Sequence, residues 1–288
     1  MLKKYISYLG VLVLACFSFY YTDRAVDIVK RNDPIMKSIV ANSENFIIDP
    51  VSAIINGDEL IVGMNGKKVN IDKSYENMKK INEYNESMLV FDEVIPDISL
   101  INEYDKYIVS GNTSKNEVAL VFKVSDNYYV NNVSNILLDK NVLATFFMDG
   151  SMVEDNMNQV LELVDNGYEI ENLGYDGSYT IEKIGWTNNL ISSLTNDDTK
   201  FCYTDYKSSD IINLCSEYQM HTIKPTISVN NYPFTTVKNA LENGSIISFN
   251  LNATTIKELP SIITYIKQKG YDIVTLEELI NENYVDEK

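Results

Sequence analysis

The sequence predicts an α/β protein whose larger, C-terminal part is a distorted (β/α) barrel of parallel strands. Two patterns lead to this fold class. From residue 118 onward, short apolar segments typical of buried strands alternate with amphipathic helical segments through short connections, as in parallel sheets with helical crossovers. About seven such units indicate a barrel. No long segment recurs, so the repetition belongs to the architecture and not to a sequence repeat.

Residues 1–23 have the features of a segment that directs a protein to the membrane or to export. Lys3 and Lys4 precede an almost uninterrupted apolar run over residues 6–21, after which polarity returns. No small-residue cleavage site follows the run, which favours a retained signal anchor over a removed export signal. Residues 13–16 (VLAC) resemble a lipobox, but the apolar run continues past Cys16. We therefore expect a single-pass membrane anchor with an extracytoplasmic domain.

Two segments separate this anchor from the barrel. Residues 24–45 show a helical spacing of apolar residues that is interrupted at Pro34, and they are expected to form a juxtamembrane stalk. Residues 46–113 consist of short apolar segments between turn signals such as Asn56-Gly57. Their one convincing helix runs over residues 74–84, with Ser74 as its cap. We expect a small α+β domain here.

The barrel itself is assigned to residues 114–288. Its predicted strands cover residues 118–124, 144–148, 168–171, 222–228, 245–251 and 273–275, and its predicted helices cover residues 131–139, 152–165, 208–217, 235–242 and 259–269. The second of these helices is expected to end at Asn166-Gly167, because glycine is common just after a helix.

Composition excludes several classes of function. The chain has 24 Lys and Arg against 41 Asp and Glu, and its net charge of -17 repels the phosphates of nucleic acids. The only histidine, His221, is expected in a linker before a strand. The cysteine spacing offers no zinc site, and no nucleotide-binding or serine-hydrolase motif occurs. Cys202 and Cys215 neither require nor exclude a disulfide.

Four ordered segments carry a resemblance to a known family. Residues 144–150 are ATFFMDG, 167–173 are GYEIENL, 244–250 are GSIISFN and 269–276 are KGYDIVTL. They resemble the A-T-F-F-x-x-G, G-H-E-I-x-N-H, G-S-I-I-L-L-H and K-G-Y-x-x-V-T-L signatures of the polysaccharide deacetylases with a NodB homology domain. The resemblance spans residues 118–279 and implies the barrel of that family.

The resemblance also implies a chemistry. Members of the family remove the acetyl group of an N-acetylated sugar: one aspartate is the base, and a second aspartate with two histidines holds a divalent metal such as zinc. Here the base position is Lys123, and the metal positions are Val124, Leu173 and Gly177. The position of a late histidine that assists the leaving amine is Asn250. The chain is therefore expected to bind no metal cofactor and to be catalytically inactive.

The replacement residues suggest other roles. Lys123 lies at the carboxyl end of the first barrel strand. Its ammonium group, paired with Asp149 or Glu171, would replace the positive charge of the family's metal. The alternative is a solvated lysine. Cys202 lies where the family places an arginine, and Trp186 is expected to pack a helix against the barrel.

Tyrosines are frequent in the loops expected at the barrel mouth. The candidate sugar-binding residues are Tyr128, Tyr175, Tyr203 and Tyr206, with Tyr129 and Tyr179 beside them. Aromatic side chains that simply cap the end of the barrel are the alternative interpretation.

The sequence favours a deacetylase-like cell-envelope protein that acts as a binding or scaffolding module, with a cell-wall glycan or an envelope protein as partner. The alternative is an active hydrolase of non-peptide carbon–nitrogen bonds, whose rearranged site would use one of five carboxylates: Asp126, Asp149, Glu171, Asp176 or Asp205. In a third interpretation, residues 46–110 make the partner contacts and the barrel only supports them.

Overall fold

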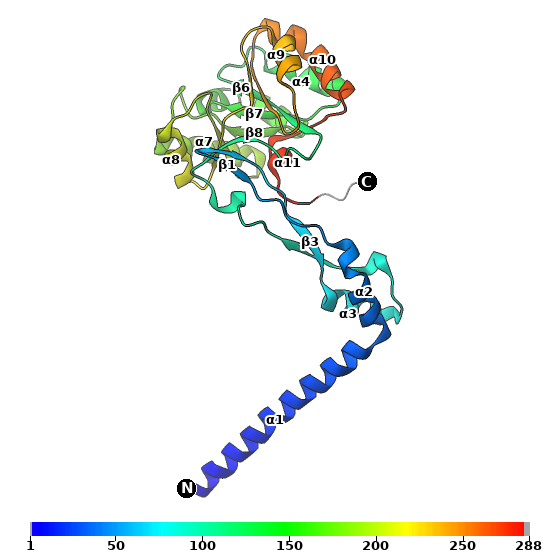
Figure 1. Ribbon diagram of the computed structural model, residues 1–288. Helices are drawn as coiled ribbons and strands as arrows, with labels where there is room; N and C mark the ends of the chain where they lie inside the picture. The colour runs from blue at the N-terminus through cyan, green and yellow to red at the C-terminus, as the bar shows by residue number, and fades with distance from the viewer. Residues whose placement is uncertain (1, 285–288) are drawn as a thin grey trace. The chain divides into compact units, whose positions relative to one another are not determined.

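The computed structural model describes the backbone of residues 2–284 and the side chains of residues 12–284 except 15, 19, 23 and 26 (Figure 1). The chain divides into two compact units. The smaller unit contains the residues up to Pro50 together with Gly66–Val94, and the larger unit contains Val51–Asn65 and the residues from Ile95 onward. The segment predicted as one domain, residues 46–113, is therefore shared between the two units.

The smaller unit is mainly helical. Its elements are α1 (Leu2–Asn32), α2 (Pro34–Ser43), α3 (Ile71–Ile81), the 3₁₀ turns Glu44–Phe46 and Glu86–Met88, and the antiparallel pair β3 (Gly66–Val69) and β4 (Phe91–Val94). Asp33 interrupts the helix before Pro34, and its carboxylate accepts a hydrogen bond from Ile35 N at the start of α2. Ser74 is not the cap of α3: that role belongs to Asn70, whose side chain accepts from Lys73 N.

The predicted anchor falls within α1. Between residues 12 and 21 of this helix, six large apolar side chains are exposed: Leu12, Val13, Leu14, Phe17, Tyr20 and Tyr21. Across the part of the chain that the structure describes, no helix combines the length and the apolar composition needed to pass through a bilayer. The anchor over residues 1–23 stays a prediction, and Met1 and the side chains of residues 2–11 lie outside the described residues.

The larger unit is built on a curled sheet, which confirms the predicted α/β distorted barrel. Within residues 51–65 and 95–284 it has eleven strands in the order β1-β2-β5-β10-β9-β8-β7-β6-β12-β11, and β13 also pairs with β6. All pairs are parallel except β1–β2. The strands are β1 (Ile54–Asn56), β2 (Glu59–Ile61), β5 (Tyr107–Ser110), β6 (Glu117–Val124), β7 (Thr145–Met148), β8 (Glu169–Asn172), β9 (Phe201–Tyr203), β10 (His221–Ile223), β11 (Ile227–Val229), β12 (Ile246–Asn250) and β13 (Asp272–Val274).

Seven helices cover the outside of this sheet: α4 (Val130–Lys140), α5 (Gly150–Asp155), α6 (Met157–Asp165), α7 (Ile181–Thr195), α8 (Ser209–Glu217), α9 (Pro233–Ala240) and α10 (Ala253–Gln268). The short helix α11 (Leu276–Ile280) and the 3₁₀ turn Leu100–Asn102 instead contribute side chains to the core inside the barrel. Figure 1 shows α4, α9 and α10 gathered on one side of the sheet. Alternate residues of β6 serve two cores: Leu120 and Phe122 pack toward the helices, whereas Ala119 and Val121 pack inside the barrel.

Three elements differ from the sequence prediction. Strands β1, β2 and β5 extend the barrel sheet beyond β10, which would otherwise leave an open edge there. The helix expected over residues 152–165 is broken at Asn156 into α5 and α6. The strand expected over residues 222–228 is divided into β10 and β11 around Pro225, which has no N–H to donate to a neighbouring strand.

Candidate functional site

A hydrogen-bonded network occupies the barrel mouth at the family's base position. Lys123, near the carboxyl end of β6, places Nζ 2.6 Å from Asp205 Oδ2 and 5.3 Å from the ring centroid of Tyr203. The Tyr203 hydroxyl donates to Asp205 Oδ1 at 2.7 Å and lies 2.7 Å from Ser248 Oγ. Burial, with the nearby Asp205 charge, raises the pKa of Tyr203. The lysine charge is thus paired with a carboxylate on the loop after β9.

The predicted partners of Lys123 were wrong. Asp149 is almost fully buried, and its carboxylate accepts from Ser151 N, Ser151 Oγ, Asp176 N and Gly177 N at 2.7–3.1 Å. It therefore caps α5 and fixes the turn between β8 and α7. A carboxylate with this many internal donors serves the local backbone and is not free for chemistry at the mouth.

The carboxylate of Glu171 is also occupied by hydrogen bonds from backbone amides. It accepts from Lys200 N and Phe201 N at 2.9 Å, and the side chain is buried. Burial and the neighbouring Glu169 raise the pKa of Glu171 well above its ordinary value, and burial raises the pKa of Glu169 to about 7. The buried Glu171 and the half-buried Glu169 form an acidic pair on β8.

The metal-ligand positions carry no donor side chain. Val124 is fully buried in the cluster that faces the helices, and Leu173 packs against the core inside the barrel. Gly177 lies in a turn with φ +67°. Among the side chains that the structure describes, no group of three or more His, Cys, Asp or Glu could hold a metal ion. The residues at these positions do not fit the family's metal.

The other residues predicted for a catalytic site do not form a common site. Asn250, at the late-histidine position, donates from Nδ2 to Asn230 Oδ1 at 3.2 Å. Asp126 is exposed and accepts from Tyr128 N, and Asp176 is exposed on the turn that Asp149 holds. Asp205 is engaged by Lys123. None of these groups approaches the arrangement of a base beside a metal or a nucleophile.

The tyrosines divide into buried and exposed groups. Tyr203 is buried, and Tyr179 donates to Tyr203 O, so both support the fold. Tyr175 is half-buried and donates to Glu154 Oε2 at 2.8 Å. Tyr128 and Tyr206 are 75% and 67% exposed on loops that follow β6 and β9.

Sequence reasoning missed a further exposed tyrosine at the mouth. Tyr232 is 78% exposed on the loop between β11 and α9, with φ +50°. A bulky residue is uncommon in this backbone region. Pro233 occupies the first helical position and could have revealed that Tyr232 lies at a helix start.

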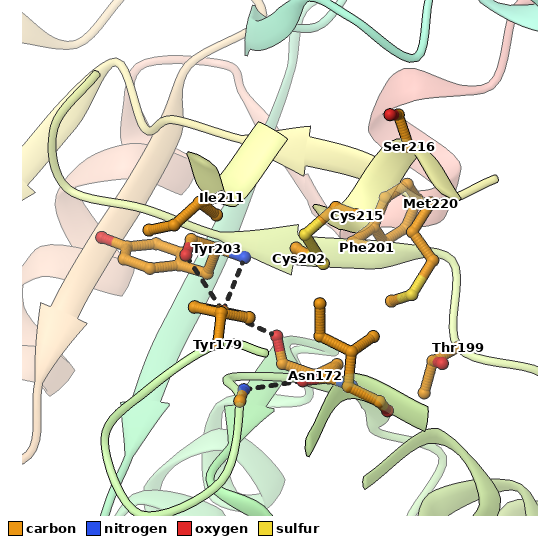
Figure 2. The surroundings of a disulfide bond; sticks show 12 residues. Asn172, Tyr179, Thr199, Phe201, Cys202, Tyr203, Ile211, Cys215, Ser216 and Met220 are labelled. Atoms are coloured by element: carbon orange, nitrogen blue, oxygen red, sulfur yellow. Dashed lines mark hydrogen bonds between the residues drawn. A yellow bond between two sulfur atoms is a disulfide. The ribbon is translucent and has the colours of Figure 1, made fainter. Parts of the chain in front are cut away.

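A disulfide joins β9 to α8 through Cys202 and Cys215, a pairing that the sequence left open. Both cysteines are buried, with Met220 beside them, and Figure 2 shows the bond next to the network of Tyr203, Tyr179 and Asn172. The Tyr179 hydroxyl donates to Asn172 O and accepts from Tyr203 N. Cys202, at the position of the family's arginine, thus tethers the strand that carries Tyr203.

Two further sequence predictions were wrong. Trp186 on α7 does not pack against the barrel, since it is 58% exposed. His221 is not in a linker: it is the first residue of β10, where its ring stacks on Tyr104 at a centroid distance of 4.4 Å. Burial lowers the pKa of His221 to about 4, so that it is neutral at physiological pH.

Comparison with known proteins agrees with this geometry. YlxY, an uncharacterized protein of Bacillus subtilis (strain 168), is 28% identical over 276 residues, which cover 89% of this chain and 86% of YlxY. A solved CE4-family pseudoenzyme from Bacillus anthracis is 26% identical with a TM-score of 0.66, covering 88% of this chain and 98% of that one. A mutant of that pseudoenzyme with restored enzymatic activity has the same TM-score at 25% identity, covering 87% and 99%.

The family profile described as polysaccharide deacetylase matches residues 110–209, a segment that runs from the end of β5 to the start of α8 and contains most of the mouth. Two of the four sequence signatures, at residues 144–150 and 167–173, fall inside it. Over residues 110–209 the chain therefore carries a domain of the polysaccharide deacetylase family.

Proposed function

We propose that this protein is a catalytically inactive, deacetylase-like protein of the cell envelope that binds glycan through its barrel mouth. The observation that carries the proposal is the replacement of the base and of all three metal ligands by Lys123, Val124, Leu173 and Gly177. The likeness to a CE4-family pseudoenzyme from Bacillus anthracis supports it.

The loss of these groups removes the main contributions to the reaction. A positioned general base contributes about 10²- to 10⁴-fold in rate, and a metal that polarises the substrate carbonyl adds several kcal/mol. At this mouth, Lys123 cannot take a proton while it is a charged ammonium paired with Asp205. The carboxylates that could substitute, Asp149 and Glu171, are both engaged by backbone amides.

Exposed aromatic side chains support a binding role. Tyr128, Tyr206 and Tyr232 lie on three loops that follow strands β6, β9 and β11, and each is at least two-thirds exposed. Sugar rings stack on such exposed aromatic faces. An envelope protein is the second partner that such a surface would suit.

An extracytoplasmic location, with attachment to the membrane through the N-terminal segment, is part of the proposal. The exposed apolar side chains of α1 support attachment to the membrane. The Cys202–Cys215 disulfide supports an oxidising compartment, because disulfides are rare in proteins of the cytosol.

Two measurements on the full-length protein test the proposal. We expect no acetate release from peptidoglycan or chitin oligomers, even with excess zinc, whereas release that a chelator abolishes would establish the alternative, an active hydrolase with a rearranged site. We expect retention on insoluble glycan to fall when Tyr128→Ala and Tyr206→Ala are combined. Tyr218→Ala, at the residue directly after α8, is the control, and equal retention by all variants would contradict binding at the mouth.

A further inference from the structure

We propose that Tyr232 is the principal contact between the barrel mouth and its glycan, and that the group stacked on its ring is a neutral sugar. This inference rests on the proposed glycan binding and adds the contacting residue and the chemical class of the ligand. Tyr232 lies on the loop between β11 and α9, directly before Pro233 at the first position of that helix. Its backbone conformation, its exposure and its neighbours each support this role.

The backbone of Tyr232 has a conformation that aromatic residues rarely adopt. Its φ is +50° and its ψ is 59°, in the left-handed region, where the Cβ of a bulky residue is crowded by the backbone. The following proline disfavours this conformation further, because the residue before a proline prefers an extended backbone. Glycine would hold the same turn with less strain. Within residues 2–284, Tyr232 is the only residue with positive φ that is not Gly, Asn, Asp or Gln; the other non-glycine residues are Asn82, Asn141, Asp176, Asn196 and Gln219.

The surrounding structure fixes this strained turn without using the tyrosine ring. Thr236 donates twice, from its backbone N–H to Tyr232 O at 3.0 Å and from its hydroxyl to Asn231 O at 3.1 Å. Two residues after the tyrosine, Phe234 N donates to Glu258 Oε2 at 2.8 Å. All of these bonds use the backbone of the loop or side chains other than that of Tyr232. A smaller residue at this position would therefore keep them.

The side chain of Tyr232 gains no stabilising contact inside the protein. It is 78% exposed, the largest exposed fraction among the large apolar side chains that the structure describes. Its hydroxyl makes no hydrogen bond, and its ring stacks on no other ring, within the described residues. Strained backbone conformations cluster at functional sites and ligand clamps, where the strain serves the function. A ring that is strained, exposed and unpartnered therefore points to a ligand outside the chain.

The polar groups next to Tyr232 are neutral amides. Asn230 Oδ1 accepts from Asn250 Nδ2 at 3.2 Å, and Asn250 lies in register beside Lys123 on β6. The N–H donors of Asn230 and the Oδ1 acceptor of Asn250 have no other partner within the described residues, so they are available to a ligand. A sugar has hydroxyls that donate and accept, and an apolar C–H face that stacks on tyrosine. Residues 230–234 carry no charge, which favours a neutral ligand.

Three variants separate the contribution of the ring from that of the strain. Tyr232→Gly removes the ring and suits the positive φ, so we expect it to unfold at a higher urea concentration than the wild type and to bind a chitin oligomer at least about fivefold more weakly. Tyr232→Phe keeps the ring face and should bind like the wild type. The matched control is Gln219→Gly, at φ +55° between α8 and β10, at the opposite end of the strands. It should also unfold at a higher urea concentration but leave binding unchanged.

Binding is measured by calorimetric titration of the full-length protein, in mild detergent, with a fully N-acetylated chitin oligomer. The titration is repeated at about 0.1 M and about 0.5 M salt. A ligand held by stacking and by neutral hydrogen bonds should bind equally at both concentrations, because salt screens only interactions between charges.

Other results would overturn separate parts of the proposal. If the wild type binds no oligomer, the proposed glycan binding itself fails. If Tyr232→Gly binds as tightly as the wild type, glycan binding stands and Tyr232 is not its contact. If Tyr232→Gly unfolds at a lower urea concentration, the ring supports the fold and the strain has an internal cause. If Tyr232→Phe binds as weakly as Tyr232→Gly, the contact is made by the hydroxyl and not by the ring face. If binding weakens markedly at the higher salt concentration, the ligand is held by charge and the neutral class is wrong.

Discussion

Lys123 and Asp205 form an ion pair, with 2.6 Å between Nζ and Oδ2, that links the end of strand β6 to the loop after strand β9. The lysine side chain is 16% exposed and the aspartate side chain 44% exposed, so the pair is only partly shielded from water. It keeps a positive charge at the family's base position and neutralises it with a carboxylate from another strand.

A double-mutant cycle with Lys123→Met and Asp205→Asn should reveal this pair. Because Asp205 is largely exposed, we expect a coupling free energy of about 0.5–1 kcal/mol in urea unfolding. The pair between Lys106 and Asp105, adjacent residues with an exposed carboxylate, is a suitable reference and should couple less. No measurable coupling between Lys123 and Asp205 would mean that the ion pair does not persist in solution.

Adjacent positions of β6 should respond very differently to an introduced aspartate. Val124→Asp places a carboxylate in a fully buried apolar cluster, and we expect the free energy of unfolding to fall by about 3 kcal/mol or more. Lys123→Asp places the same group on the partly exposed mouth side, beside Asp205, and should cost clearly less. Urea unfolding of both variants measures the difference, and similar losses would contradict the assignment of the two faces.

Glu169 should make the protein less stable as pH rises. Burial raises the pKa of Glu169 to about 7, whereas in the unfolded chain it titrates near its ordinary value of 4.5. Between these values the native state holds a proton that the unfolded state has lost, so the free energy of unfolding falls with increasing pH, by up to about 3 kcal/mol.

Unfolding of the wild type and of Glu169→Gln from pH 4.5 to about 7 measures this effect. The glutamine resembles the protonated acid and should flatten the profile. Glu162→Gln, at an exposed position of α6, should leave the slope unchanged. Parallel profiles for the wild type and Glu169→Gln would show that Glu169 does not titrate in this range.

The disulfide should stabilise the larger unit. It closes a loop with a sequence separation of 13 residues, for which the loss of chain entropy in the unfolded state predicts about 3 kcal/mol. We expect Cys202→Ala/Cys215→Ala to unfold at a lower urea concentration than Cys16→Ala. Mass spectrometry of the protein after alkylation should find a single reactive thiol, and three reactive thiols would contradict the bond.

The sequence predicted those parts of the fold whose signal is local. Strand β6 is a long apolar run, and the helix that follows it shows a clear apolar periodicity, so both were predicted to within one residue at each end. The helix after β12 was also predicted, but it begins at Ala253, six residues before the predicted start. Strands β1, β2 and β5 have only three or four residues each. Their place in the barrel depends on partners far along the chain, such as β10 for β5, which no local pattern encodes.

The same limit applies to the site. The family signatures located the replaced positions, but not the partner of Lys123, because Asp205 reaches it from a loop whose course depends on the packing of β9. The residues from Met152 to Asp165 suit a continuous helix, and the break at Asn156 arises from its bonds to Met152 and Asn127.

The location of β13 has a consequence for biosynthesis. Strand β6 lies centrally in the sheet, yet two of its three neighbours, β12 and β13, are formed by residues 246–274. Leu276 and Leu279 fill the barrel interior after that, and Glu282 accepts from Leu100 N at 3.1 Å. While the ribosome is still making these residues, β6 can pair only with β7, and the strongly apolar strand keeps one open edge, which invites aggregation or chaperone binding. The barrel can close only after residues 246–282 have left the ribosome, so its folding has to wait for pairings that are distant along the chain.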